Sequence, residues 1–144
     1  MSVIIREVKD GSDFAICMAI RMEVFVREQG VPLEEEMDDH DAAATHYVAT
    51  LNGAPAATAR TRVLEDGTAK IERVAVRAEH RGSGIGKQLM EHLIKRMRNH
   101  PKTKTIRISA QEQAAPFYEK LGFVLQGEGF MEAGIPHFTM ELAR

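Results

Sequence analysis

The sequence predicts an α/β fold for a single domain spanning residues 1–144: a mixed central sheet, an antiparallel meander followed by a parallel strand, flanked by helices. Three strand-like runs separated by short turn signals predict the meander: residues 46–51, 56–64 and 69–76. Residues 85–99 then place apolar side chains at helical spacing. The strand-like residues 105–110 follow that helix directly, so this strand is expected to lie parallel to the strand before the helix.

The N-terminal third is expected to form a strand, a helix and an acidic connection. Residues 3–8 are predicted as the first strand. Residues 10–13 offer turn and N-cap side chains, and a helix is expected from there to residue 28, before Gly30 and Pro32 end it. Residues 33–44 then form an acidic connection with room for a short helix.

Two turn signals join the strands of the meander. Asn52-Gly53 is typical of a two-residue hairpin turn, because both turn positions need positive φ, which these residue types adopt easily. Asp66-Gly67 is the second such signal.

The second half alternates helices and strands. The predicted helix 85–99 ends before Pro101, and its apolar face is formed by Ile85, Leu89, Met90, Leu93, Ile94 and Met97. A short helix is expected over residues 114–121, closed by Gly122 at the C′ position. Residues 123–126 and 138–142 are predicted as a final pair of strands.

Composition excludes several classes of protein. With 44% hydrophobic and 28% charged residues, the chain has the balance of a globular domain rather than a disordered one. Cys17, the single cysteine, excludes an intramolecular disulfide and is expected to be a small core residue rather than an acyl carrier. Since the first residues are charged too early for a signal peptide and no apolar run reaches a membrane span, we expect a cytoplasmic protein without a membrane partner.

Positive charge is concentrated in one third of the chain. The net charge is −2 overall, but residues 70–107 carry a net charge of +8 inside an otherwise acidic protein. This block indicates either a local anionic ligand or a solvated basic helix face. Because no aromatic side chains interleave the basic residues of the helix, nucleic acid is not an expected partner.

A glycine-rich turn between a strand and a helix is the segment with the most chemical content. The strand ends at Val74, Ala75 and Val76, and the turn continues as Arg81, Gly82, Ser83, Gly84, Ile85, Gly86 and Lys87. Helix N-termini favour acidic side chains, yet this first turn carries Lys87 and no acid. Uncovered N–H groups beside cations indicate a phosphate site, with a plain glycine-rich turn as the alternative. The spacing fits neither a P-loop nor a dinucleotide fingerprint.

Two motifs in this order resemble the GNAT superfamily of N-acetyltransferases. The pattern Arg81-x-x-Gly84-x-Gly86 after a strand resembles the acetyl-CoA signature of that family, and residues 114–123 are similar to its tyrosine-bearing helix and following strand. Three further segments resemble a small bacterial branch, the ElaA/YjcF-like proteins: residues 24–29, residues 38–41 with His46, and residues 134–137.

The resemblance implies acetyl-CoA as cosubstrate. The backbone amides from Arg81 to Lys87 would bind the pyrophosphate, and the strand from Val74 to Val76 would pair with the pantetheine arm. Arg81 and other cations of the basic block would meet the 3′-phosphate of the ADP moiety. Gln111 stands where many members carry Asn, and its amide would still bond to pantetheine or backbone.

The resemblance also implies catalytic roles. Tyr118 matches the general acid that protonates the departing thiolate; the alternative is a core tyrosine with its hydroxyl bonded to backbone. Glu72 is one candidate general base, expected by alternation to share a face with Val74 and Val76; the alternative is a salt bridge with Arg60 or Arg62.

His137 is the second candidate base, because a turn at residues 134–136 would aim it inward. The alternative is a surface histidine at the start of a strand.

The expected reaction is acetyl transfer from acetyl-CoA to a primary amine by direct attack in a ternary complex, with a non-catalytic CoA-binding module as the alternative. The acidic run over residues 34–41 is either a negative rim that attracts the amine or a solvated loop. No metal site is expected, since the spacing of Asp38, His40, Asp41 and His46 matches no standard site. The oligomeric state stays open between a monomer and the homodimer common among relatives.

Overall fold

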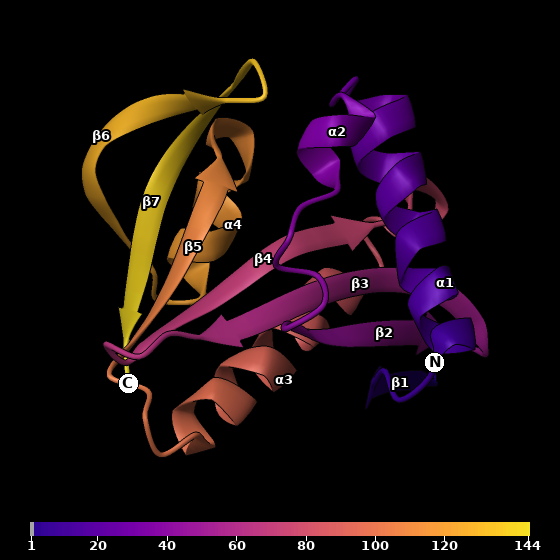
Figure 1. Ribbon diagram of the computed structural model, residues 1–144, viewed down its shortest axis with the longest axis horizontal. Coiled ribbons are helices and arrows are strands. Elements are labelled where there is room, and N and C mark those ends of the chain that lie inside the picture. The colour runs from indigo at the N-terminus through magenta and orange to yellow at the C-terminus, as the bar shows by residue number, and fades with distance from the viewer. Residues whose placement is uncertain (1) are drawn as a thin grey trace.

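A seven-stranded mixed sheet in the order β1-β2-β3-β4-β5-β7-β6 runs through the computed structural model, which describes residues 2–144 (Figure 1). The strands are β1 (Val3–Glu7), β2 (Thr45–Leu51), β3 (Ala54–Val63), β4 (Thr68–Val76), β5 (Thr105–Gln111), β6 (Val124–Glu132) and β7 (Ile135–Ala143). β4 and β5 pair in parallel, and the other neighbours pair antiparallel. The predicted meander and the predicted parallel strand are therefore confirmed.

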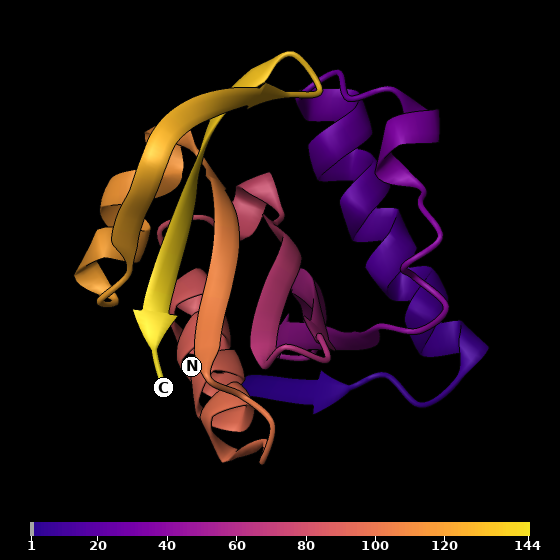
Figure 2. The same ribbon diagram turned by 60° about the vertical axis from the view of Figure 1, so that its left-hand side comes forward.

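Helices cover both faces of this sheet (Figure 2). They are α1 (Gly11–Arg21), η1 (Met22–Glu28), α2 (Leu33–Glu36), η2 (Ala78–His80), α3 (Ile85–Asn99), η3 (Glu112–Ala114) and α4 (Ala115–Lys120). The predicted apolar face of α3 is fully in the core, where Leu89, Met90 and Leu93 have no exposed surface. Burial of side chains of this size contributes about 1.5–3 kcal/mol each. Within residues 2–144, no helix combines the length and the apolar character that crossing a bilayer requires.

The first helix has the predicted extent but changes type halfway. It begins at an N-cap, Asp10, whose side chain accepts a 2.9 Å hydrogen bond from the N–H of Asp13. From Met22 onward it is the π-helix η1. A π-turn admits an extra residue, and nothing in the local periodicity of the sequence marks that insertion.

The two turn signals had different outcomes. Asn52 and Gly53 adopt φ of 51° and 85°, so the first hairpin is confirmed. Four residues separate β3 from β4, so the second connection is longer than a two-residue turn. There only Gly67 has positive φ, and a Cβ on it would lie 2.8 Å from the carbonyl oxygen of Lys102.

A β-bulge interrupts β4. Arg60 pairs with Glu72 and Thr58 pairs with Ala75, so Arg73 and Val74 together oppose one residue of β3. The bulge reverses the alternation of side chains that follows it. Val74 and Val76 pack against the core on the α3 side, whereas Ala75 packs on α1. The expectation that Glu72 shares a face with Val74 and Val76 was therefore wrong.

The parallel pairing between β4 and β5 is short. Only Thr68–Lys70 of β4 is in register with β5, whose partners there are residues 105–107. Beyond Lys70 the two strands diverge like the sides of a V (Figure 1). The backbone of β4 beyond this point has no strand on its β5 side, so the sheet opens in its middle.

The C-terminal hairpin is longer than predicted. β6 and β7 each have nine residues, and the turn between them is Ala133-Gly134, with φ of 52° and 75°. His137 consequently lies within β7, opposite Gln111 of β5, and not directly after a turn as expected. The helical prediction for residues 114–121 is confirmed, with η3 preceding α4.

Candidate active site

A cleft of about 800 Å³ opens where β4 and β5 separate. Its walls come from the end of β4, the ends of β5 and β7, and residues of η1, α2 and α4. Of the residues predicted from the sequence, the cleft brings together Glu72, Val74, Ala75, Val76, Arg81, Gln111, Tyr118 and His137. The rest of the glycine-rich turn lies outside this set, at the start of α3.

The edge of β4 presents backbone groups to the cleft. The N–H of Arg77 donates to the carbonyl oxygen of Ala56 at 2.8 Å, so residue 77 faces β3. In an antiparallel pair the residues alternate in direction, which turns the N–H of Val76, and that of Val74, toward the β5 side. These two N–H groups are available to a ligand that enters the V.

The glycine-rich turn forms a cradle of N–H groups. Gly82 and Gly84 adopt φ of 82° and 87°, and a Cβ on either would meet nothing within 4 Å. Within residues 2–144 no hydrogen-bond acceptor serves the N–H groups of Gly82, Gly84, Gly86 or Lys87. The first turn of α3 holds no acidic residue. This geometry suits a phosphate group.

The other residues of that turn hold it in place. The hydroxyl of Ser83 donates to the carbonyl oxygen of His80 at 2.6 Å and accepts the N–H of Ile85 at 3.4 Å. The side chain of Ile85 is in the core. Arg81 donates through Nε to the carbonyl oxygen of Val76 at 2.9 Å and pairs through Nη2 with Glu28 at 2.7 Å. The guanidinium of Arg81 thus ties the turn to β4 and to η1.

Gln111 is part of a chain of amide side chains. Its Nε2 donates to Oε1 of Gln29 at 2.7 Å, and its Oε1 accepts Nε2 of Gln113 at 2.6 Å. All three residues line the cleft. The amide of Gln111 therefore links the end of η1 to the end of β5.

Tyr118 is buried, with 9% of its surface exposed, and lies edge-on to Phe117 and Phe123. Its hydroxyl has no hydrogen-bond partner among residues 2–144, in contrast to the alternative of a core tyrosine bonded to backbone. Burial raises the pKa of this hydroxyl to about 12, so it keeps its proton throughout the physiological range.

His137 is enclosed in the cleft and is not the surface histidine that the sequence left as an alternative. It is 8% exposed and stacks on Phe130 at 5.7 Å between ring centroids. Its Nδ1 lies 2.7 Å from the carbonyl oxygen of Ile135, which fixes the proton on Nδ1 in the neutral ring. Nε2 is then free to accept a proton, with Glu132 3.6 Å away.

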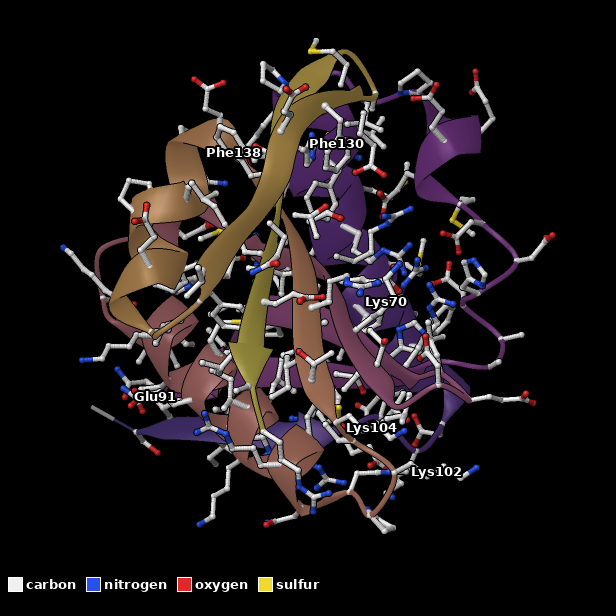
Figure 3. All side chains as sticks on the ribbon, turned by 90° about the vertical axis from the view of Figure 1, so that its left-hand side faces the viewer. Lys70, Glu91, Lys102, Lys104, Phe130 and Phe138 are labelled. Atoms are coloured by element: carbon white, nitrogen blue, oxygen red, sulfur yellow. The ribbon has the colours of Figure 1, made fainter. Side chains whose placement is uncertain are left out.

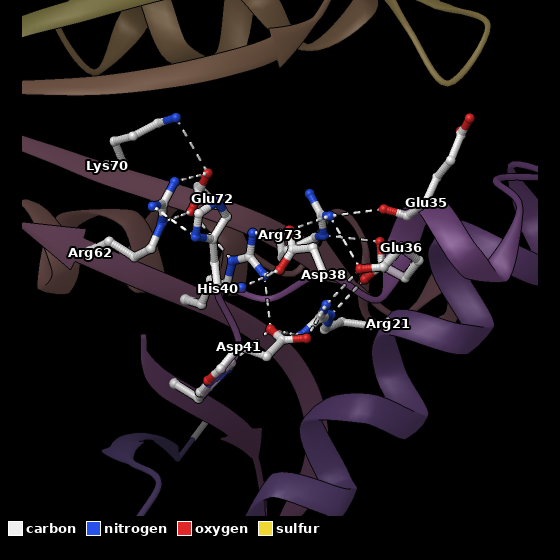
Figure 4. A network of polar contacts seen from close by, with 12 residues as sticks. Arg21, Glu35, Glu36, Asp38, His40, Asp41, Arg62, Lys70, Glu72 and Arg73 are labelled. Atoms are coloured by element: carbon white, nitrogen blue, oxygen red, sulfur yellow. Dashed lines mark hydrogen bonds and ion pairs between the residues drawn. The ribbon is translucent and has the colours of Figure 1, made fainter. Parts of the chain in front are cut away.

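Glu72 forms the salt bridges that the sequence left open as its alternative role (Figure 4). It accepts from Arg62 at 2.7 and 3.1 Å and from Arg60 at 3.3 Å, and Lys70 lies 3.5 Å away. Burial would raise the pKa of Glu72, but the hydrogen bond from Arg62 and the charges of Arg60, Arg62 and Lys70 outweigh it and lower the pKa to about 2. A carboxylate held in this way is a weak base.

Three carboxylates of the acidic run are held by buried arginines. Glu36 pairs with Arg21 at 2.6 Å, and Asp41 lies 2.8 Å from both Arg21 and Arg60. Asp38 pairs with Arg60 at 2.7 Å, and the hydrogen bond from Arg60 holds the pKa of Asp38 well below its ordinary value. These residues form neither the attracting rim nor the solvated loop that the sequence suggested, whereas Glu34, Glu35 and Asp39 are exposed.

Cys17 is a core residue as predicted. It is fully buried, its thiol lies 3.6 Å from the carbonyl oxygen of Tyr47, and burial raises its pKa. It does not line the cleft. In the part of the chain that the structure describes, no group of three ligating side chains is placed to hold a metal ion.

The cleft also contains residues that were not predicted as site residues, among them Phe25, Gln29, Lys70, Arg73 and Ser109. Strand alternation was a usable signal for two of them, since Lys70 shares a face with Glu72, and Ser109 shares one with Gln111. Arg73 carried no such signal, because its direction depends on the bulge.

Comparison with known proteins gives consistent matches over nearly the whole chain. A family model described as an acetyltransferase (GNAT) domain matches residues 8–144. The chain is 41% identical over 122 residues to YjcF of Bacillus subtilis, named an N-acetyltransferase, covering 84% of this chain and 86% of YjcF. It is 32% identical over 126 residues to ElaA of Escherichia coli, covering 85% of this chain and 82% of ElaA.

Solved structures share the fold. The crystal structure of Escherichia coli ElaA superposes with a TM-score of 0.86 and 27% identity over 97% of this chain and 99% of that one. A GNAT family acetyltransferase from Elizabethkingia anophelis, solved with acetyl-CoA bound, has a TM-score of 0.76 and 17% identity over 99% of this chain and 98% of that one. This second likeness concerns the fold alone.

Proposed function

Because the chain belongs to the GNAT family of acetyltransferases, we propose that it moves an acetyl group from acetyl-CoA to a primary amine, which attacks the thioester directly while both substrates are bound. One observation carries this proposal. The sheet opens between β4 and β5, and the opening holds the unbonded hydroxyl of the buried Tyr118 and an enclosed histidine with a free ring nitrogen.

The residues present suit acetyl-CoA as the acyl donor. The uncovered N–H groups from Gly82 to Lys87 fit a pyrophosphate, and the free edge of β4 fits the amide groups of a pantetheine arm. A protein of the same fold holds acetyl-CoA in its crystal structure. Arg81 supports this site by holding the turn rather than by offering a free guanidinium.

Deprotonation of the acceptor is assigned to His137. A primary amine arrives as an ammonium ion, and Nε2 of His137 accepts one proton from it, because Nδ1 already donates to Ile135. The nitrogen lone pair then attacks the carbonyl carbon of the thioester. Glu72 is not assigned this role, since a carboxyl with a pKa of about 2 has little affinity for a proton at neutral pH.

Charge on the thioester oxygen is stabilised by the N–H groups of Val74 and Val76, which are fixed by the strand before the reaction begins. As the carbon–sulfur bond breaks, the Tyr118 hydroxyl gives its proton to the CoA thiolate. The nitrogen of the adduct loses its second proton to solvent, which leaves a neutral amide. The proton held by His137 restores the tyrosine through solvent, so the enzyme returns to its starting state. A non-catalytic CoA-binding module, the second hypothesis from the sequence, would have no use for this unbonded hydroxyl.

The test is a pair of measurements on Tyr118→Phe. Calorimetric titration with acetyl-CoA should give the wild-type affinity, because the ring still packs on Phe117 and Phe123. Thiol release in a screen of primary amines should fall by roughly 10²–10⁴ relative to the wild type, the usual contribution of a positioned acid.

The control is Phe117→Leu, which alters the same aromatic contact without a proton donor. It should keep most of the turnover. A wild-type protein that does not bind acetyl-CoA would overturn the proposal, and so would unchanged turnover in Tyr118→Phe.

Two expectations from the sequence stay predictions of our own. The single cysteine favours a cytoplasmic location, and the resemblance favours a homodimer as the assembly to test, by fractionation and by light scattering respectively.

A further inference from the structure

The wall of the cleft beside Glu72 contains an ion network with an excess of positive charge (Figure 4). Its cations are Arg21, Arg60, Arg62, Lys70 and Arg73, and its carboxylates are Glu36, Asp38, Asp41 and Glu72. Five cations thus face four carboxylates. His40 lies beside this network, with its Nδ1 3.2 Å from Nη1 of Arg62. A half-buried excess charge is costly unless an opposite charge meets it.

Arg73 holds one end of this network from a strained backbone position. Its φ of 54° lies in the left-handed region, which costs a non-glycine residue about 1–3 kcal/mol. Nε lies 3.0 Å from Glu36, and Nη2 donates to the carbonyl oxygens of Glu35 and Glu36 and to Asp38. Nη1 has no partner among residues 2–144 and points into the space between β4 and β5 (Figure 4).

Lys70 holds the other end. It belongs to the last residue pair that joins β4 to β5, so it stands at the apex of the V. Its side chain is 27% exposed, and among residues 2–144 its ion pair is with Glu72 at 3.5 Å. In Figure 3 Lys70 lies on the open face between β5 and the N-terminal helices.

Two exposed acidic residues lie elsewhere around the same cleft. Glu35 belongs to α2, and Glu132, at the end of β6, lies 3.6 Å from Nε2 of His137. The cleft therefore has acidic groups at its rim and two cations along β4, Lys70 and Arg73. A molecule with an ammonium group and a carboxylate a few bonds apart matches both charges.

We propose that the acceptor is a small amine that also carries a carboxylate, and that Lys70 and Arg73 bind the carboxylate while the amine faces His137. This inference rests on the proposed function and narrows its acceptor to α- and ω-amino acids. Arg73 and Lys70 supply donors that neutral or purely cationic amines leave unpaired, so such amines are disfavoured.

The first experiment measures binding, without turnover. Protein saturated with CoA is titrated, by ligand-observed NMR, with the twenty L-amino acids and the ω-amino acids from β-alanine to 6-aminohexanoate. Each is run beside the amine that lacks its carboxylate. At least one amino acid should bind roughly tenfold or more tightly than its matched amine, the usual size of a charged hydrogen bond.

Variants assign that preference to the two cations. Lys70→Gln should reduce the preference for the amino acid by about tenfold and leave binding of the matched amine unchanged. Lys102→Gln, which removes an exposed lysine outside the cleft, should change neither. Arg73→Lys keeps the charge and tests the direction of Nη1, and thermal melts confirm that each variant is folded.

Two results would overturn the inference: equal or tighter binding of the matched amines, or no binding of any amino acid in the panel. A preference that survives Lys70→Gln and Arg73→Lys unchanged would also overturn the assignment to these residues. Failure of the proposed function looks different, since acetyl-CoA would not bind, or Tyr118→Phe would turn over normally. The panel is therefore repeated on the protein without CoA, where carboxylate binding is read independently.

Discussion

His137 and Tyr118 take opposite roles in proton transfer. His137 accepts a proton at Nε2, because its Nδ1 already donates to the carbonyl oxygen of Ile135. Tyr118 must stay protonated, and because burial raises its pKa to about 12, no loss from this residue is expected below strongly alkaline pH. His137→Gln should lower kcat by roughly 10²–10⁴, because it removes the ring nitrogen that accepts the proton of the amine. A His137→Gln variant that keeps the wild-type kcat would exclude His137 as the base.

Glu72 makes the stability of the protein depend on pH. Its folded-state pKa of about 2 lies below the ordinary value of 4.5, so the folded protein binds this proton more weakly than the unfolded chain. The stabilisation is fully present above pH 4.5 and is lost as the pH falls toward 2. A pKa lowered from 4.5 to about 2 corresponds to on the order of 3 kcal/mol.

Urea unfolding of the wild type and of Glu72→Gln, across this range, checks the prediction. The difference between their free energies of unfolding should shrink as the pH falls. A difference that stays constant from neutral pH to pH 2.5 would mean that Glu72 does not carry this effect.

At the scale of the element, a substitution in the glycine-rich turn should weaken the binding of acetyl-CoA more than it lowers the stability of the fold. Gly84→Ala forces a side chain onto a φ of 87° but meets no neighbouring atom, so stability should fall by only about 1–2 kcal/mol. Acetyl-CoA affinity should fall more steeply, because the strained turn no longer aims its N–H groups together. Gly11→Ala at the start of α1 is the matched control, since it also meets nothing within 4 Å and has no positive φ. Calorimetry and thermal melts read the two effects, and equal affinity in both variants would contradict the prediction.

The sequence predicted elements whose cause is local. The apolar face of α3 repeats with the helical period of about 3.6 residues, and the Asn52-Gly53 turn depends only on those two residues. The predictions of the helix and of the hairpin were therefore correct. The bulge at Arg73 is a feature of the register between β3 and β4, and the π-helix packs on Ala75 of a distant strand, and neither has a signature in the local sequence. The partners of Arg21 and Arg60 lie 12 to 22 residues away along the chain, beyond the reach of periodicity. In the cleft, the family resemblance located the residues, while their hydrogen bonds required the structure.

At the scale of the whole molecule, Arg21 should be an ion-pairing side chain whose loss is costly. It is 1% exposed and pairs with the buried Glu36 and the half-buried Asp41. Removing one partner of a buried pair typically costs about 3–5 kcal/mol. Because Arg21→Met leaves Arg73 beside Glu36 and Arg60 beside Asp41, a loss at the lower end of that range is expected. Lys9→Met is the control: its pair with Glu7 has the same 2.6 Å separation, but Lys9 is 76% exposed, so less than about 1 kcal/mol is expected. Chemical denaturation measures both, and similar losses would contradict the burial argument.

Because the pairing between β4 and β5 is short, few backbone hydrogen bonds hold the two halves of the central sheet together. Three residue pairs join one half-sheet, β1 to β4, to the other, β5 to β7. Acetyl-CoA bound along β4 would supply the hydrogen bonds that a neighbouring strand supplies elsewhere in the sheet. The ligand would therefore bridge the two halves of the sheet. Deuterium exchange at the amides of Val74 and Val76 should therefore slow on loading, together with amides of β5 that the ligand never touches. The sheet would then become more rigid each time acetyl-CoA binds and less rigid each time CoA leaves. Product release would thus be coupled to the relative motion of the two halves of the sheet.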